Sequence, residues 1–213
     1  DEHILLIMAD DIAYHHNNPQ QGVVQHVPNG ENLYEGIEID YRLSEISPEI
    51  FQRILLGEME NSLHADSDDN VLLFWSGHGE RGNWVWREEG KFSDELLRLT
   101  LDRMAQEQKY RKLLGLIETC YSGSMGMMTE GIPGVLFVTA ANEQETSKAE
   151  CYSTDLGVWM TNRFTTTLLD CIEKNPDVAF RELYYHLFFP YQYLWLQNKI
   201  KSSKYNNNVF YQN

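Results

Sequence analysis

The stretch LLGLIETCYSGSM, residues 113–125, decides the fold class and raises the question of function. It begins with an apolar run, Leu113–Ile117, which is typical of a β-strand buried on both faces of a sheet. The run ends at Glu118, and Cys120 follows just before the turn-forming residues Ser-Gly-Ser. The stretch therefore predicts a cysteine at the carboxyl end of a buried strand.

Similar apolar runs alternate along the chain with segments of helical spacing. The other predicted buried strands cover residues 3–9, 71–75 and 135–140. Helices are expected over residues 48–59, 94–108, 158–174 and 179–188, and a hairpin over residues 84–92. Ser47 and Ser93 are the expected N-caps of the first two helices. Strands alternating with helices indicate βαβ units, so we expect an α/β domain over residues 1–213 with a mostly parallel sheet.

The charge balance and the cysteine count exclude several classes of protein. The chain has 32 acidic against 17 basic residues, a net charge of −15, which argues against nucleic acid or anionic lipid as the main partner. No apolar run approaches the roughly 18–20 residues that a membrane span needs. The 3 cysteines are too few for a disulfide framework. A bridge between Cys151 and Cys171 is one possibility, although the apolar helical pattern around Cys171 predicts a core position.

Two of the predicted strands end in residues that can carry chemistry. The run VLLFW, residues 71–75, is followed by Ser76-Gly77-His78-Gly79, and the run at 113–117 leads to Cys120. Taken separately, His78 could be an ordinary turn residue and Cys120 a small buried hydrophobic residue. Because carboxyl ends of neighbouring parallel strands meet at one sheet edge, the two are expected to face each other. A cysteine beside a histidine is the arrangement of thiol nucleophilic catalysis.

The expected reaction explains why these residue types are needed. A free thiol has a pKa of ~8.5 and is mostly protonated at neutral pH, so a neighbouring imidazole supplies the proton acceptor. The imidazolium can then protonate the leaving amine. The backbone N–H groups of Gly79 and Cys120 are the candidate oxyanion hole.

The motifs FWSGHG and IETCYSGSM resemble those of the caspase-like cysteine peptidases, and within that clan the legumain family. That family includes asparaginyl endopeptidases and the catalytic subunit of the GPI-anchor transamidase. Further resemblance lies in ADDIAYHHNNPQQGVV, IDYRLSEISPEIFQRILLG and TAANEQETSKAECY, so it covers nearly the whole chain. It implies a caspase-like three-layer αβα sandwich, His78 as the general base and Cys120 as the nucleophile.

The resemblance also implies the residues of the S1 pocket, which receives the P1 side chain of the substrate. Glu118 and Ser147 match positions that line this pocket, although each could also be an ordinary polar residue at a strand end or in a loop. Val158 stands where legumain has a pocket aspartate. The loss of that charge makes a smaller or less selective P1 residue credible beside Asn.

In the family a central strand and a helix precede the strand expected at residues 3–9. The resemblance therefore implies an N-terminal segment of the same precursor that completes the sheet, because an unpaired central edge is aggregation-prone. A trimmed chain or a different topology is the alternative. By resemblance alone, the protein is expected in the secretory pathway, in a lysosome or vacuole, in the ER lumen or outside the cell.

The sequence thus predicts a cysteine endopeptidase that cleaves peptides or unfolded protein segments after Asn or a small polar residue, through a thioester at Cys120. No metal or other cofactor is expected. A transamidase or transpeptidase, in which an amine replaces water, is the alternative enzyme. An inactive caspase-like binding module is a further alternative, against which the presence of both His78 and Cys120 argues. A doubly wound small-molecule binder would need a glycine-rich phosphate loop, and the sequence shows none.

Overall fold

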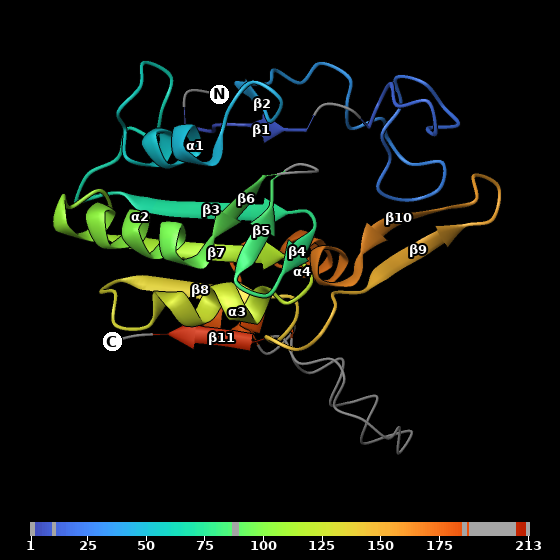
Figure 1. Ribbon diagram of the computed structural model, residues 1–213. Coiled ribbons are helices and arrows are strands. Elements are labelled where there is room, and N and C mark those ends of the chain that lie inside the picture. Colours follow the sequence, from blue (N-terminus) through green and yellow to red (C-terminus); the bar gives the residue numbers. More distant parts are fainter. Residues whose placement is uncertain (1–2, 10–11, 87–89, 185–186, 188–207, 212–213) are drawn as a thin grey trace.

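The computed structural model describes residues 3–9, 12–86, 90–184, 187 and 208–211. Its main sheet has the strand order β11-β8-β7-β3 (Figure 1). The strands are β3 (Asn70–Ser76), β7 (Lys112–Glu118), β8 (Val135–Thr139) and β11 (Asn208–Tyr211). β3 and β8 both run parallel to β7, whereas β11 pairs antiparallel with β8. The predicted α/β class with a mostly parallel sheet is confirmed, and β11 is an addition that we did not predict.

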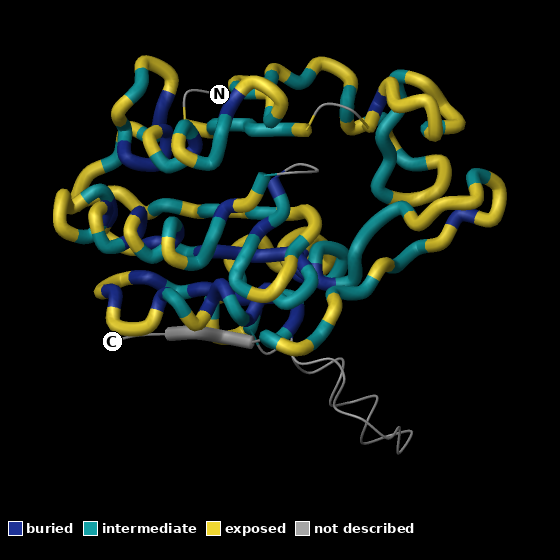
Figure 2. The backbone as a smooth tube through the Cα atoms, in the orientation of Figure 1, coloured by how far each residue is buried: buried dark blue, intermediate teal, exposed yellow. Residues whose placement is uncertain are grey.

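The alternation along β7 explains why its sequence is apolar throughout. Leu113 and Ile117 belong to a core cluster shared with α1 (Pro48–Leu55) and α2 (Asp94–Gln106). Leu116 belongs to a second cluster, shared with α4 (Arg163–Lys174). Because successive strand residues point to opposite faces, the two clusters lie on opposite sides of the sheet. Figure 2 shows how strongly β7 is buried compared with the outer parts of the chain.

The first two helices begin where the sequence predicts. The Ser47 hydroxyl accepts a hydrogen bond from the Ile50 N–H at 3.3 Å, and Pro48 occupies the first turn of α1. The Ser93 hydroxyl accepts from the Leu96 N–H at 3.2 Å and caps α2 in the same way. In both cases a local side-chain contact determines where the helix starts.

The expected hairpin is present as part of a small antiparallel sheet of β4 (Gly79–Glu80), β5 (Asn83–Val85) and β6 (Lys91–Ser93). Residues 87–89 of the expected turn lie outside the described residues. Trp84 is fully buried, and its ring stacks on Trp75 of β3 with centroids 4.6 Å apart. This stacking joins the small sheet to the main one and fixes the position of the segment between β3 and β4.

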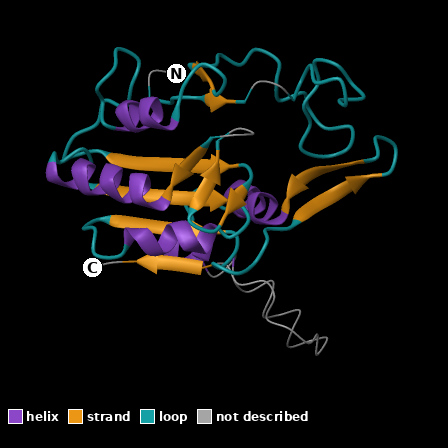
Figure 3. Ribbon diagram, in the orientation of Figure 1, coloured by secondary structure: helices purple, strands orange, loops and turns teal. Residues whose placement is uncertain are grey.

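The predicted helix over residues 158–174 is wrong in its first five residues. Val158–Asn162 is the strand β10, which pairs antiparallel with β9 (Ala149–Ser153), and α4 starts only at Arg163. The turn explains the difference, because Gly157 has a φ of +70° and donates its N–H to the Ser153 carbonyl at 2.8 Å. Figure 3 shows β9 and β10 as a hairpin that projects from the main sheet. Of the helix expected over 179–188, residues 180–184 and 187 are described and are helical.

The N-terminal strand is shorter than predicted. Instead of residues 3–9, only β1 (Ile7–Met8) is a strand, and it pairs parallel with β2 (Tyr41–Arg42) in a separate sheet. Within the described residues β3 therefore has a strand partner on one side only, and it forms the edge of the main sheet. Two short helical turns, α3 (Ser122–Gly126) and η1 (Met127–Thr129), follow β7. No helix in the described part of the chain is both long and apolar enough to cross a membrane.

Candidate active site

The strand register places His78 and Cys120 beside each other. Ser76 and Glu118 are the last paired residues of the parallel strands β3 and β7. The Gly77 N–H donates to the Glu118 carbonyl at 3.2 Å, so the hydrogen bonding between the two strands continues one residue beyond the last pair. His78 and Cys120 each follow two residues after the last pair. The two side chains that the sequence singled out thus leave the same edge of the sheet from adjacent strands.

Gly79 allows the histidine segment to approach the cysteine segment closely. A Cβ atom at residue 79 would lie 2.6 Å from Thr119 Oγ1 and would overlap the Cys120 carbonyl oxygen. The Val85 N–H donates to the His78 carbonyl at 3.0 Å, so Gly79 and Trp84 form the next pair, which is not hydrogen-bonded. The Gly79 N–H is therefore directed away from β5, as an oxyanion-hole donor must be. The Cys120 N–H also has no hydrogen-bond acceptor within the described residues.

A strained turn holds Cys120 at the strand end. Tyr121 has a φ of +55°, which is uncommon for a residue with a side chain, and its N–H donates to the Glu145 carbonyl at 2.7 Å. The Ser122 hydroxyl accepts from the Ala141 N–H at 3.1 Å. A Cβ atom at Gly123 would lie 2.7 Å from the Glu143 nitrogen. The segment after β8 therefore fixes the backbone on the C-terminal side of the cysteine.

Glu118 is a buried carboxyl group directly beside the cysteine segment. Its side chain is 1% exposed, and Oε2 accepts from the backbone N–H and the hydroxyl of Thr165, each at 3.1 Å. Oε1 has no hydrogen-bond partner within the described residues. Burial is the largest influence and raises the pKa of Glu118 to about 7, against the smaller opposing effects of Thr165 and the Ser147 hydroxyl. The carboxyl group is therefore poised to change charge near neutral pH.

Ser147 contacts the cysteine directly. Its hydroxyl lies 3.8 Å from Cys120 Sγ, and either atom can be the donor. Cys120 is half-buried and His78 is exposed, so both are accessible from the side of the strand ends. Within the described residues His78 makes no side-chain hydrogen bond, which leaves both ring nitrogens available to a substrate or to the thiol.

Val158 lies apart from these residues. It pairs with Ser153 near the tip of the β9–β10 hairpin, whereas the base of the hairpin is the pair Ala149–Asn162. The residues that contact Cys120 and Glu118 from this part of the chain are Ser147, which precedes β9, and Thr165, which follows β10. The structure thus brings His78, Gly79, Glu118, Cys120 and Ser147 together and places Val158 along the hairpin.

Two residues of this site have no recognisable signal in the sequence. Thr165 reaches Glu118 only because α4 packs across the end of β7, and Tyr121 matters through its backbone conformation. Cys171 is buried, as its pattern predicts, and all three cysteines are free thiols. Within the described residues there is no group of three or more His, Cys, Asp and Glu side chains that could hold a metal ion.

Comparison with known proteins assigns the sequence to a family. The model of the peptidase C13 family matches residues 1–186. The chain belongs to the peptidase C13 family. Human legumain is 36% identical over 172 residues, which are 75% of this chain and 39% of legumain. A putative GPI-anchor transamidase of Drosophila melanogaster is 30% identical over 182 residues, 82% of this chain and 51% of that protein. The GPI-anchor transamidase of Bos taurus is 30% identical over 185 residues, 83% of this chain and 47% of that protein.

This C13 chain therefore spans about two fifths to one half of the length of these relatives. The family resemblance inferred from FWSGHG and IETCYSGSM is confirmed. The matched region contains both strand ends, with His78 and Cys120 in it.

Proposed function

We propose that this protein is a cysteine endopeptidase that hydrolyses peptide bonds after Asn or a small polar residue. One observation carries the proposal: His78 and Cys120 occupy matching positions beyond the last pair of the adjacent strands β3 and β7. Membership of the peptidase C13 family supports the same reaction. The backbone turn at Tyr121 and the close approach at Gly79 support a site built to hold a reactive group.

In the first half of the reaction the thiol proton of Cys120 passes to the His78 imidazole, and Sγ attacks the carbonyl carbon of the substrate. The carbonyl oxygen becomes negatively charged and accepts hydrogen bonds from the Gly79 and Cys120 N–H groups. A single donor of this kind contributes ~3–4 kcal/mol in known enzymes. The C–N bond then breaks, and the imidazolium returns its proton to the leaving amine. A thioester with Cys120 remains.

In the second half His78 removes a proton from a water molecule, which attacks the thioester carbon. The C–S bond breaks, the peptide leaves with a new carboxyl group, and Cys120 recovers its proton. Glu118 and Ser147 are the proposed S1 residues, whereas the position of Val158 along the hairpin does not support its expected place in this pocket. Glu118 Oε1 has no partner within the described residues, so it is free to accept a hydrogen bond from the amide of a P1 Asn.

A transamidase is the second candidate, and the matches to GPI-anchor transamidases at 30% identity favour keeping it. The chemistry up to the thioester is the same, and an amine in place of water then attacks the thioester carbon. Adding an amine such as hydroxylamine to a cleavage assay separates the two. A transamidase converts most of the thioester to the hydroxamate, whereas a hydrolase releases mainly the carboxylic acid.

We also propose that the complete fold is the caspase-like three-layer αβα sandwich, with residues 1–213 in one domain. β3 is an edge strand, and its side chains Leu72 and Phe74 are 61% and 46% exposed. Exposed apolar side chains on an open edge favour a further strand of the same precursor beside β3. The proposed location is the secretory pathway, and the proposed substrates are peptides or unfolded protein segments.

A panel of fluorogenic peptides that vary at P1 tests the proposed function, with the wild type, Cys120→Ala and Cys151→Ala over pH values from about 4 to about 8. The wild type and Cys151→Ala should cleave the Asn substrate, whereas Cys120→Ala should lose at least about a thousandfold in kcat/KM. Cys151 is the matched control because it is a free, half-buried thiol outside the site. Cleavage that survives in Cys120→Ala would end the proposal.

A further inference from the structure

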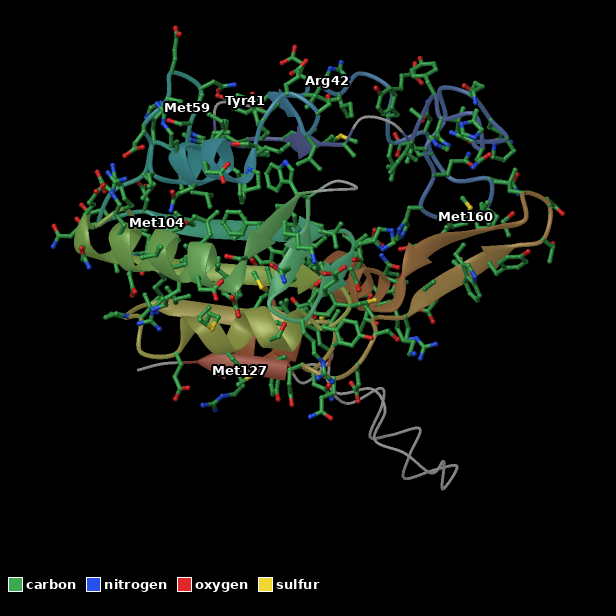
Figure 4. All side chains as sticks on the ribbon, in the orientation of Figure 1. Tyr41, Arg42, Met59, Met104, Met127 and Met160 are labelled. Carbon is green, nitrogen blue, oxygen red and sulfur yellow. The ribbon has the colours of Figure 1, made fainter. Side chains whose placement is uncertain are left out.

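Beyond the end of the main sheet, one hydroxyl joins the two segments that carry the reacting side chains. The Ser124 hydroxyl accepts a hydrogen bond from the Gly82 N–H at 2.9 Å and donates one to the Tyr121 carbonyl at 2.7 Å. Gly82 lies in the turn between β4 and β5, and Figure 1 shows this turn next to α3. Ser124 lies within α3, and Met127, which is labelled in Figure 4, directly follows this helix.

The turn at Gly82 is connected to the histidine by paired backbone. β4 starts at Gly79, directly after His78, and the Val85 N–H of β5 donates to the His78 carbonyl at 3.0 Å. Gly82 has a φ of +72°, a conformation that favours glycine, and its carbonyl accepts from the Asp94 N–H at 2.8 Å. A hydrogen bond at Gly82 therefore acts on the position of His78 through a short, hydrogen-bonded hairpin.

The other end of the bridge is the strained residue after the cysteine. Tyr121 follows Cys120 directly and has a φ of +55°. Its carbonyl accepts from both the N–H and the hydroxyl of Ser124, at 2.9 and 2.7 Å. In the same turn as Gly82, the guanidinium carbon of Arg81 lies 6.0 Å from the centre of the Tyr121 ring. The turn between β4 and β5 thus meets the cysteine segment at two points.

Among the described residues no other hydrogen bond does the same. The last hydrogen bond between β3 and β7 is the one donated by Gly77. Beyond it, the bond between Gly82 and Ser124 is the one hydrogen bond of the described residues that joins residues 78–86 to residues 119–126. The close approach of the two segments is otherwise a van der Waals contact, which prevents a shorter separation but hardly resists a longer one.

The bridge needs a hydroxyl, and the reaction needs the bridge. A hydroxyl can donate and accept at the same time, whereas the N–H of Gly82 only donates and the carbonyl of Tyr121 only accepts. Proton transfer from a thiol to an imidazole requires hydrogen-bond contact, and a displacement of about 1 Å can cost about a hundredfold in rate. The proposed S1 residues Glu118 and Ser147 make no hydrogen bond to Ser124 within the described residues.

We infer that Ser124 is a positioning residue, whose hydroxyl holds the segments of His78 and Cys120 at the separation that proton transfer requires. Ser124 has no hydrogen bond to either reacting side chain within the described residues, so it acts through the backbone of Gly82 and Tyr121. The inference rests on the proposed peptidase function and adds to it a residue that determines the rate of the reaction without touching the substrate.

Variants of the full-length protein separate positioning from folding. Ser124→Ala removes the bridge. Ser62→Ala is the matched control, because the Ser62 hydroxyl also donates to a carbonyl three residues earlier, that of Met59 at 2.6 Å, in the loop after α1. Ser124→Thr and Ser124→Val have the same shape and differ only in the hydroxyl, so this pair decides the question even if Ser124→Ala folds poorly. Kinetics on the Asn peptide and a thermal unfolding curve are measured for each variant.

The expected loss is in kcat and not in KM. Ser124→Ala and Ser124→Val should lower kcat by about tenfold or more and leave KM within about twofold of the wild type, because the S1 pocket is unchanged. Ser124→Thr should retain kcat within about threefold, and Ser62→Ala within about twofold. The inference is overturned if Ser124→Val has the same kcat as Ser124→Thr, or if Ser124→Ala loses no more than Ser62→Ala.

Alkylation of Cys120 by iodoacetamide, followed by mass spectrometry of the peptide that contains it, needs no substrate. At about pH 6 an isolated thiol is almost fully protonated, so its alkylation rate depends on a neighbouring base. The rate should fall about fivefold in Ser124→Val but not in Ser124→Thr, and equal rates would overturn the inference. A wild type that cleaves none of the peptides would overturn the proposed function, whereas the alkylation rates would still decide whether Ser124 positions the two segments.

Discussion

Glu118 is the residue whose chemistry depends most on its surroundings. One carboxylate oxygen accepts two hydrogen bonds from Thr165, and the other has no partner within the described residues. Burial therefore outweighs hydrogen bonding and raises the pKa to about 7. The proposed S1 pocket contains a group that donates a hydrogen bond when protonated and only accepts when ionised, so its preference for a P1 amide is expected to increase with pH.

Replacing Glu118 by Gln should flatten the pH dependence of the free energy of unfolding between pH 4.5 and about 7. The folded-state pKa lies above the unfolded value, so the stability associated with the protonated form is fully present below pH 4.5. It is lost as the pH rises through 7, by up to about 3 kcal/mol. Urea unfolding across this range measures the slope, with Glu60→Gln on an exposed loop as the control. An unchanged slope in Glu118→Gln would contradict the assignment.

A second residue-scale prediction concerns the two glycines that flank His78. Gly79→Ala should reduce kcat/KM by at least about a hundredfold, because the new methyl group overlaps the Cys120 carbonyl and Thr119. Gly77→Ala is the matched control, since its Cβ would lie 3.9 Å from Trp75 Nε1 in ordinary contact. Kinetics on the Asn substrate and a thermal unfolding curve for each variant separate lost activity from lost folding. Equal activities of the two variants would refute the close approach.

At the scale of elements, the sequence correctly predicted the features that depend on neighbouring residues. The caps of α1 and α2 and the buried strand β7 follow from neighbouring residues, and His78 and Cys120 follow from the rule for strand ends. Val158–Asn162 was assigned to a helix because the apolar run LGVWM fits either period. Pairing with β9 makes this segment a strand. The sequence of the segment alone does not show that pairing, because the partner lies on the other side of a turn. Thr165 could not be predicted for the same reason, since its contact with Glu118 is tertiary.

Ser93→Ala should lower the free energy of unfolding by about 1 kcal/mol, because the Leu96 N–H loses its acceptor at the start of α2. Ser67→Ala, in an exposed turn, should change it by less than about 0.5 kcal/mol. Urea unfolding of both variants measures the difference. Equal values would mean that the cap adds nothing to α2.

At the scale of the whole molecule, one face of β3 is left uncovered. This outer face carries Leu72 and Phe74. Val71, Leu73 and Trp75 pack against the main core, whereas Leu72 and Phe74 point to the other side and remain exposed. β1 pairs with β2 and not with β3, so the two strands form a sheet separate from the main one. Two separate sheets have more unpaired edge strands than one continuous sheet would have. A covering segment of the precursor would bury the outer face of β3 and pair its edge.

Phe74→Glu distinguishes a covered from an open β3 in the full-length protein. If a segment covers it, as we propose, the buried charge should lower the free energy of unfolding by about 3 kcal/mol or more. Leu99→Glu is the control, because Leu99 is 62% exposed on α2 and should tolerate the change within about 0.5 kcal/mol. Urea unfolding measures both variants, and equal small effects would show that β3 faces solvent.

The contacts of Asn18 have a chemical consequence for the lifetime of the protein. Its side-chain amide nitrogen donates three hydrogen bonds to carbonyl oxygens of the loop that follows β1, and Oδ1 accepts one from the Gln20 N–H. Deamidation to Asp would replace that donor by a carboxylate oxygen, which faces three carbonyl oxygens and repels them. We expect aged preparations that carry this single change to lose the order of the loop while the thiol still reacts.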